Sequence, residues 1–276
     1  MSYEGEFSAS DGLNFYERCW DAQGEAAAHL VLLHGYGEHC SRYAEVGAAC
    51  SAAGITVHTY DQRGFGHSPG KRAYIGRFDL LLADLDAYLE HIRDRFDGKP
   101  WFMMGHSMGG MVLGAYVETR DLDARGLVFS SPFLAFPEDT PKLLLTISGI
   151  AGSILPWMPV GGVDSAGLSR DPAVIEAADN DPLSFHGMVR ARTGAQFKYA
   201  MERIHAASRK IALPAYIIQG GADKVIGPSG AQKLFDGIAS EDKQLKLYDG
   251  GYHELWNDLC KEEVVSGIIE WIKERS

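Results

Sequence analysis

The sequence is poor in cysteine and in basic residues. Its four cysteines, Cys19, Cys40, Cys50 and Cys260, are scattered without CxxC spacing, which excludes a disulfide framework and a thiolate metal site. Lys and Arg number 26 against 37 Asp and Glu, a formal net charge of −11. Because such a chain repels phosphate backbones, we expect no nucleic-acid partner. The unpaired thiols, and the lack of a basic start followed by an apolar run at the N-terminus, predict a cytoplasmic location.

The HExxH, P-loop and EF-hand patterns are absent too, so the sequence predicts neither a metal nor another cofactor. Long apolar runs are also scarce, with one exception: residues 143–163 carry no charge. This run is long enough to cross a bilayer. However, Pro156, Pro159 and the lack of a flanking basic cluster favour a buried or lid-forming segment instead.

Short apolar runs alternate with helical patterns along most of the chain. Six runs predict strands of a parallel sheet, since most are apolar on both faces: 29–35, 55–61, 101–107, 126–131, 215–221 and 245–250. The clearest helical pattern lies between Phe78 and Phe96, and a second one precedes the C-terminus at 264–272. Residues 3–20, with a turn signal at Asp11 and Gly12, predict an antiparallel hairpin at the sheet edge. The fold class is therefore α/β, with a mostly parallel central sheet and helices on both faces.

The alternation stops between about Phe133 and Lys210, where the chain is far longer than one crossover needs. We therefore predict a core domain made of residues 1–132 and 211–276, with residues 133–210 inserted as a cap. The cap has eight basic and eight acidic residues, so the whole net charge lies on the core. A neutral cap with a long apolar stretch suits an apolar, uncharged ligand. Simple packing of that stretch on the core is the alternative that the sequence leaves open.

The clearest chemical signal is a G-x-S-x-G motif at residues 105–109. It lies between a predicted strand and a predicted helix, which is the context in which a serine on a tight turn acts as a nucleophile. The small glycines allow the crowded turn that presents the Ser107 hydroxyl above the carboxyl edge of the sheet. The N–H of Met108 then lies at the start of the following helix, where the helix dipole favours an anion.

A serine hydroxyl needs a base, and the base needs an acid that orients it. In this fold the chain order is Ser, then Asp or Glu, then His. Of ten histidines, His253 is the candidate base, because it lies in a Gly-Gly loop directly after the last predicted strand. Asp223 follows the preceding strand and is the candidate acid. Asp249 is the alternative, although its position four residues before His253 is more typical of a turn former.

A tetrahedral intermediate also needs two hydrogen-bond donors for its oxyanion. The Met108 N–H is one candidate. The other is the Tyr36 N–H, because Tyr36 lies between two glycines in the loop that follows the strand at 29–35. These five residues, Ser107, Asp223, His253, Tyr36 and Met108, make up the predicted site.

These motifs resemble those of the α/β-hydrolases, and within them the monoacylglycerol lipase and lysophospholipase group with its serine aminopeptidase-like relatives. The resemblance depends on HGYGEHCSRY (34–43), DQRGFGHSPG (61–70), GHSMGG (105–110), GGADKV (220–225) and GGYHE (250–254). It implies that Ser107, Asp223 and His253 form the family's triad and that Tyr36 and Met108 form its oxyanion hole. It also implies a cap over an apolar acyl tunnel. In the second of these segments, Asp61 and Arg63 are expected to form structural ion pairs.

The predicted reaction is hydrolysis of a lipid-type carboxylic ester through an acyl-enzyme, with a monoacylglycerol as the preferred substrate. A lysophospholipase, a general carboxylesterase or thioesterase and an aminopeptidase remain alternatives. A ligand-binding homologue without catalysis is the alternative from another class. We also consider transient contact between lipid surfaces and the apolar stretch 143–163, with Trp157 as the interfacial anchor.

Overall fold

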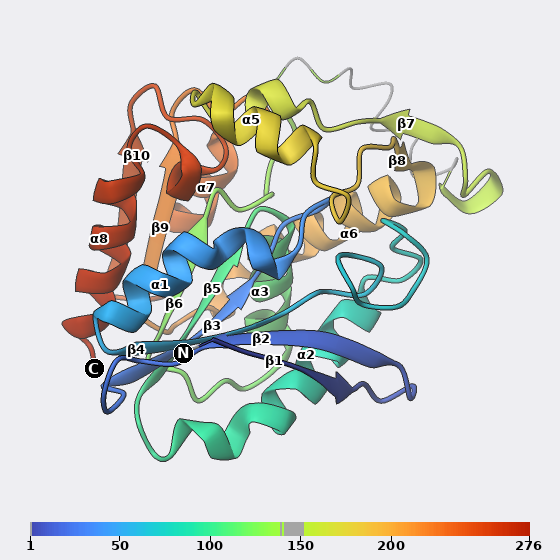
Figure 1. Cartoon of the computed structure of the whole chain (residues 1–276). Helices are drawn as coiled ribbons and strands as arrows, with labels where there is room; N and C mark the ends of the chain where they lie inside the picture. The colour runs from blue at the N-terminus through green and yellow to red at the C-terminus, as the bar shows by residue number, and fades with distance from the viewer. Residues whose placement is uncertain (1, 139, 141–151) are drawn as a thin grey trace.

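A computed structural model describes residues 2–138, 140 and 152–276 of the chain. Its centre is an eight-stranded sheet with the strand order β1-β2-β4-β3-β5-β6-β9-β10 (Figure 1). The six strands from β4 to β10 in this order are parallel, whereas β2 is antiparallel to both β1 and β4. The strand bounds are β1 Ser2–Ser8, β2 Asn14–Trp20, β3 Ala28–Leu33, β4 Ile55–Tyr60, β5 Trp101–His106, β6 Gly126–Ser130, β9 Ala215–Gly220 and β10 Lys243–Tyr248.

The six predicted strands and the edge hairpin are confirmed. Strands β3, β4, β6 and β9 are buried along their whole length, which is why their sequences are apolar on both faces. Each strand ends one or two residues earlier than its apolar run, because the final residues already belong to the loops at the carboxyl edge. The predicted fold class is therefore correct.

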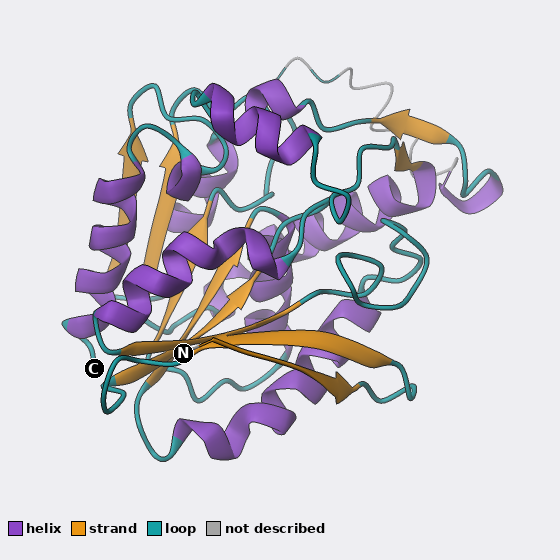
Figure 2. Ribbon diagram, viewed as in Figure 1, coloured by secondary structure: helices purple, strands orange, loops and turns teal. Residues whose placement is uncertain are grey.

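Helices cover both faces of the sheet (Figure 2). On one face, α1 (Ala44–Ala52) and α8 (Lys261–Lys273) pack on a cluster that includes Val57 and Leu30. The other face is covered by α2 (Asp79–Ile92), α3 (Met108–Thr119) and α7 (Ser229–Gly237). The predicted helix between Phe78 and Phe96 is confirmed as α2 followed by a 3₁₀ turn over Arg93–Phe96. The predicted C-terminal helix is α8.

Strand pairing brings the loops that follow the strands together at one edge of the sheet. Leu33 pairs with Gly105, so the loop after β3 leaves the sheet beside the turn after β5. His106 pairs with Ser130 across to β6. Tyr248 pairs with Gly220, which places the loops after β9 and β10 side by side. Four loops from distant parts of the sequence therefore meet at the carboxyl edge.

The described part of the chain between β6 and β9 lies over this edge (Figure 1). It forms β7 (Pro159–Gly161), α5 (Pro172–Asp179), β8 (Val189–Arg190) and α6 (Ala191–Ala207). Helix α6 also packs against α3, so the division into core and cap at residues 132/133 and 210/211 stays a prediction. Residues 143–151 of the uncharged stretch 143–163 lie outside the described residues, whereas residues 152–163 are described. Every helix within the described ranges is too short or too polar to cross a bilayer.

Candidate active site

The turn after β5 has the backbone of a nucleophile elbow. Ser107 has φ +51° and ψ −115°, a conformation that side-chain-bearing residues rarely adopt. A Cβ atom at Gly105 would collide with the backbone of Gly109, and one at Gly109 would collide with the carbonyl of Leu33. The glycines of the motif are therefore required by the close approach of three backbone segments. Strain of this kind is common at catalytic positions.

Hydrogen bonds to the main chain hold this strained turn in place. The Ser107 N–H donates to the Ser130 carbonyl at 3.0 Å, and the Ser107 carbonyl accepts from Phe133 N–H at 3.0 Å and from Met111 N–H at 3.1 Å. Only 7% of the residue's surface is exposed, and that surface lines a cavity of about 650 Å³. The serine is thus presented to the cavity by a backbone that is anchored on both sides.

The predicted acid and base are in contact. His253 Nδ1 lies 2.8 Å from Asp223 Oδ2. The other carboxylate oxygen, Oδ1, accepts N–H hydrogen bonds from Val225 at 2.8 Å and Ile226 at 3.1 Å, and Gln219 Nε2 donates to Oδ2 at 2.9 Å. Since the carboxylate accepts from Nδ1–H, the imidazole is held in the tautomer that leaves Nε2 free to accept a proton.

The electrostatics of this pair favour its charged form. Burial alone disfavours the imidazolium, but the Asp223 carboxylate outweighs burial, and the pKa of His253 lies above its ordinary value of 6.5. Burial also opposes ionisation of Asp223, yet His253 and the backbone N–H groups of Val225 and Ile226 lower the pKa of that carboxyl. The pair can therefore stabilise a proton taken from a nucleophile.

The base and the nucleophile face the same space. The His253 ring lies against the ring of His106, the residue before Ser107, with centroids 4.8 Å apart. Ser107 and His253 both line the cavity. Burial and the neighbouring His253 lower the pKa of His106 well below its ordinary value, so His106 is a neutral neighbour and not a competing base.

Both predicted oxyanion donors are free in the described part of the chain. The N–H of Met108 is the first of α3 and has no acceptor within the helix. Neither this N–H nor that of Tyr36 has a hydrogen-bond partner among the described residues. The loop of Tyr36 is held by its neighbours: Gly35 N–H donates to Glu38, and the Tyr36 hydroxyl donates to the Ala73 carbonyl at 2.8 Å.

A buried charge network beside the site was missed by the sequence analysis. Arg42 donates through two nitrogens to the Glu254 carboxylate at 2.7 and 2.8 Å and lies 3.5 Å from Glu38. Tyr43 donates its hydroxyl to Glu38 at 2.7 Å. Burial raises the pKa of Glu38 above its ordinary value. The only signal in the sequence was that Glu38, Arg42 and Glu254 belong to the same motifs as the candidate site residues.

The expected ion pairs of the 61–70 segment are confirmed for one residue and wrong for the other. Arg63 pairs with Asp84 and with Asp11. Asp61, in contrast, accepts backbone N–H hydrogen bonds from Cys40 and His67, both at 2.8 Å, and pairs with no cation among the described residues. The Asp61 carboxylate therefore links two loops by accepting a backbone N–H hydrogen bond from each of them.

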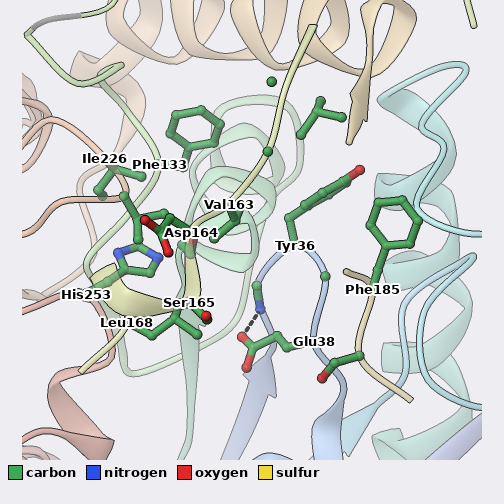
Figure 3. A pocket seen from close by; sticks show the side chains of 18 of the residues that line it. Tyr36, Glu38, Phe133, Val163, Asp164, Ser165, Leu168, Phe185, Ile226 and His253 are labelled. Carbon is green, nitrogen blue, oxygen red and sulfur yellow. Dashed lines mark hydrogen bonds between the residues drawn. The ribbon is translucent and has the colours of Figure 1, made fainter. Parts of the chain in front are cut away.

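The cavity is apolar along most of its wall (Figure 3). Aromatic and aliphatic side chains from the core and from the chain over it line the wall together: Tyr36, Phe133, Phe136, Val160, Phe185, Val189, Phe197 and Ile226. The charged and polar groups include the buried Glu38 and Glu254 and the exposed Asp164 and Asp179. No group of three or more His, Cys, Asp or Glu in the described ranges is arranged to hold a metal.

Comparison with known proteins gives a consistent result. Residues 24–260 match the family described as serine aminopeptidase S33. The chain is 31% identical to a monoglyceride lipase of Rattus norvegicus over 269 residues, which cover 96% of this chain and 89% of the relative. It is 29% identical to a monoacylglycerol lipase of Mycolicibacterium smegmatis, with 98% and 96% covered. The crystal structure of a Paleococcus ferrophilus monoacylglycerol lipase matches with a TM-score of 0.85 and 31% identity, covering 95% of this chain and 99% of that one.

Proposed function

The chain belongs to the serine aminopeptidase S33 family of α/β-hydrolases, and we propose that it is a serine ester hydrolase that cleaves monoacylglycerols into fatty acid and glycerol. One observation carries the proposal. Ser107 and His253 open into a cavity whose wall is mostly apolar and whose volume, about 650 Å³, is within the range of small-molecule sites. An ester with one long acyl chain and a small head group fits such a cavity.

In the proposed mechanism, Ser107 Oγ attacks the ester carbonyl while His253 Nε2 accepts its proton. Asp223 keeps the imidazole in the required tautomer and stabilises its charge. The Tyr36 and Met108 N–H groups bind the oxyanion. The imidazolium then protonates the departing glycerol, and the C–O bond breaks to leave an acyl-enzyme. A water molecule then gives a proton to His253 and attacks the acyl carbonyl. The bond between the acyl carbon and Ser107 Oγ breaks, His253 returns the proton to Oγ, and the fatty acid is released.

The charges around the cavity support a neutral head group. Among the described residues that line the cavity, Arg42 is the one arginine or lysine, and its guanidinium is already paired with Glu254. Asp164 and Asp179 add negative charge to the lining. A phosphate head group would meet more carboxylates than free cations, which disfavours anionic lysophospholipids relative to a glycerol ester.

An aminopeptidase is the second candidate, because carboxylates can also hold a substrate ammonium. Asp164 and Asp179 are exposed at the cavity lining and could do so. Their exposure weakens this interaction, since solvent and salt screen exposed charges. The apolar wall gives a long acyl chain more buried contact than a small peptide needs. We therefore place the ester first.

A substrate panel tests the proposal. We expect kcat/KM to be highest for 1-oleoylglycerol, lower for lysophosphatidylcholine and oleoyl thioesters, and lowest for lysophosphatidic acid and leucine anilide. The Ser107→Ala variant is the control and should lose all of these activities together. Faster turnover of the anilide or of the anionic lipid than of the glycerol ester would refute the proposed substrate.

We also propose that the protein makes transient contact with lipid surfaces near the cavity. The supporting observation is a set of exposed apolar side chains around β7: Ile154, Leu155, Trp157, Val163 and Met188. Trp157 is half exposed and stacks on Tyr74 with ring centroids 4.2 Å apart. Liposome flotation on phosphatidylcholine should weaken in Trp157→Asp but not in Leu259→Asp, because Leu259 is an exposed apolar residue elsewhere on the surface. Equal flotation of both variants would refute the contact.

A cytoplasmic location is the last part of the proposal. All four cysteines are free, which is typical of a reducing compartment. Imaging of the tagged full chain in its own host tests this, and a secreted protein would contradict it.

A further inference from the structure

Helix α5 connects the two halves of the candidate catalytic machinery. It follows segment 167–171, which contacts the loop that carries His253, and it precedes segment 181–185, which contacts the loop that carries Tyr36. We call residues 249–258 the base loop and residues 34–39 the oxyanion loop. Figure 1 shows α5 lying over the carboxyl edge of the sheet, where both loops emerge.

The first contact is a partly buried ion pair on the base loop. The Asp258 carboxylate is fully buried and accepts from Arg170 Nε at 3.0 Å and from Arg170 N–H at 2.9 Å. Its Oδ2 also accepts from Tyr252 N–H, the residue before His253, at 2.8 Å. Burial opposes ionisation of Asp258, but these donors outweigh it and lower the pKa of the carboxyl. One carboxylate thus ties the chain before α5 to the neighbour of the base.

Two backbone hydrogen bonds reinforce this contact. The Glu254 N–H donates to the Leu168 carbonyl at 2.8 Å, and the His253 N–H donates to the Gly167 carbonyl at 3.5 Å. The base itself is therefore bonded to segment 167–171 through its own main chain.

The second contact is on the oxyanion loop. His39 Nε2 lies 2.7 Å from Asp181 Oδ2, with both side chains mostly buried. The Phe185 N–H donates to the Gly37 carbonyl at 2.7 Å. Gly37 directly follows Tyr36, whose N–H is a proposed oxyanion donor. Asp181 Oδ1 accepts from Leu183 N–H at 2.9 Å, so the same carboxylate also shapes segment 181–185.

The helix between these contacts is short and well defined. Asp171 caps its N-terminus by accepting from Ala173 N–H at 2.9 Å, and Pro172 is its first residue. Eight residues of α-helix are about 12 Å long. A capped helix of that length is a stiff spacer between its two ends.

We propose that residues 167–185 form a brace that sets the position of the base loop relative to the oxyanion loop, with Arg170 and Asp181 as positioning residues. This inference rests on the proposed function, because it assigns the brace to the alignment of His253 and the Tyr36 N–H around one reacting ester. In this view the chain over the sheet edge is part of the catalytic scaffold as well as a cover for the acyl chain.

Loss of either contact should lower the rate of reaction more than the binding of substrate. A misplacement of about 1 Å in a catalytic group can cost about 100-fold in rate. We therefore expect Arg170→Gln and Asp181→Asn each to lower kcat for p-nitrophenyl butyrate by about 10- to 100-fold, with KM changed by less than about threefold. Phosphonylation of Ser107 by a small fluorophosphonate should slow by a similar factor, because it needs the same alignment.

Variants at the two ends of the brace should differ in the pH dependence of kcat/KM. Arg170→Gln loosens the base loop and weakens the contact between His253 and Asp223, so the acid limb of kcat/KM should move to lower pH. Asp181→Asn leaves that contact intact, so its acid limb should stay in place. Arg170→Lys retains a cation beside Asp258 and should recover part of the rate.

Asp242→Asn is the matched control. Asp242 forms an exposed two-point ion pair with Arg275 at 2.8 Å, away from both loops, and its loss should leave kcat within twofold of the wild type. Thermal unfolding of every variant shows whether it is folded at the assay temperature. If Arg170→Gln is unfolded, kcat and the acid limb of kcat/KM are compared between Arg170→Lys and Asp181→Asn instead, and this comparison still tests the brace.

Three results would overturn the brace. Arg170→Gln and Asp181→Asn could both retain the kcat of the Asp242→Asn control. They could lose kcat/KM only through a raised KM. They could also both shift the acid limb of kcat/KM by the same amount. An active wild type with unaffected variants refutes the brace alone. A wild type that neither hydrolyses esters nor reacts with the fluorophosphonate refutes the proposed function, and the brace with it.

Discussion

Replacement of Asp223 by asparagine should abolish most of the catalysis without disturbing the fold. The geometry dictates how the new amide must lie. Oδ1 of Asp223 accepts two backbone N–H groups, from Val225 and Ile226, so the asparagine oxygen must occupy that position. The amide NH₂ is then directed at His253 Nδ1, where the carboxylate used to accept. A donor at this position stabilises the imidazole tautomer whose Nε2 carries the proton.

That tautomer cannot accept a proton from Ser107. Loss of the orienting carboxylate in a Ser-His-Asp triad lowers kcat by about 10⁴-fold, which corresponds to about 5.4 kcal/mol of transition-state stabilisation. Asp223 is not among the residues that line the cavity, so KM should change little. Steady-state hydrolysis of 1-oleoylglycerol and of p-nitrophenyl butyrate measures both quantities, and thermal unfolding checks that the variant is folded.

Asp249→Asn is the control with the same chemical change. Asp249 is the alternative acid of the sequence analysis, and its side chain is exposed on the base loop. We expect it to keep kcat within about threefold of the wild type. The reasoning is refuted if Asp223→Asn retains more than a tenth of the wild-type kcat, or if Asp249→Asn is the variant that loses it.

Three further predictions follow from the site. His253 must be neutral to accept a proton, and its pKa lies above 6.5, so kcat/KM should rise with pH through a midpoint above 6.5. A lower midpoint would contradict the His253–Asp223 pairing. Gly109→Ala should destabilise the fold by about 1–3 kcal/mol and lower Tm by several degrees, because the new Cβ would collide with the backbone carbonyl of Leu33 in β3. An unchanged Tm would show that the elbow is less tightly packed than described. Arg42→Met leaves Glu38 and Glu254 buried without their cation and should cost about 3–5 kcal/mol. The loss should be larger at pH 8 than at pH 6, because both carboxyls are ionised in the unfolded chain at either pH and their protonation in the folded variant costs more as pH rises. Urea denaturation at the two pH values measures this, and a pH-independent loss would argue against buried carboxylates as the cause.

The sheet and the candidate triad could be predicted for the same physical reason. Parallel strands are buried on both faces, so their sequences are continuous apolar runs that stand out against the helices. Loops after such strands meet at one edge, which is why Ser107, Asp223 and His253 could be selected by their positions after strands. Ser107 was clearest, because crowding of the elbow leaves glycines in the sequence.

The charge networks could not be predicted, because their partners are far apart in the chain. Arg42 and Glu254 are separated by 212 residues, and Arg170 and Asp258 by 88. Each of these residues is an ordinary polar residue until tertiary structure brings its partner close. The same reason explains the wrong expectation for Asp61, whose hydrogen-bond donors are two backbone N–H groups that only the folded loops place beside it.

The elements over the sheet edge were also beyond prediction. Helix α5 has eight residues, too few to be stable without its cap and its tertiary contacts. Helix α6 buries one side against α3, so its pattern resembles that of a core helix although it belongs to the segment predicted as a cap. The sequence therefore indicated an insertion but not how firmly it is attached to the loops below.

The most direct test of the account is the site of reaction with a fluorophosphonate. The wild-type chain should gain one phosphonyl group, and peptide mass spectrometry should place it on Ser107, with no label on the Ser107→Ala variant and a fall of about a millionfold in its kcat for 1-oleoylglycerol. Label on another serine, or hydrolysis that persists in the alanine variant, would contradict a catalytic centre at the turn between β5 and α3.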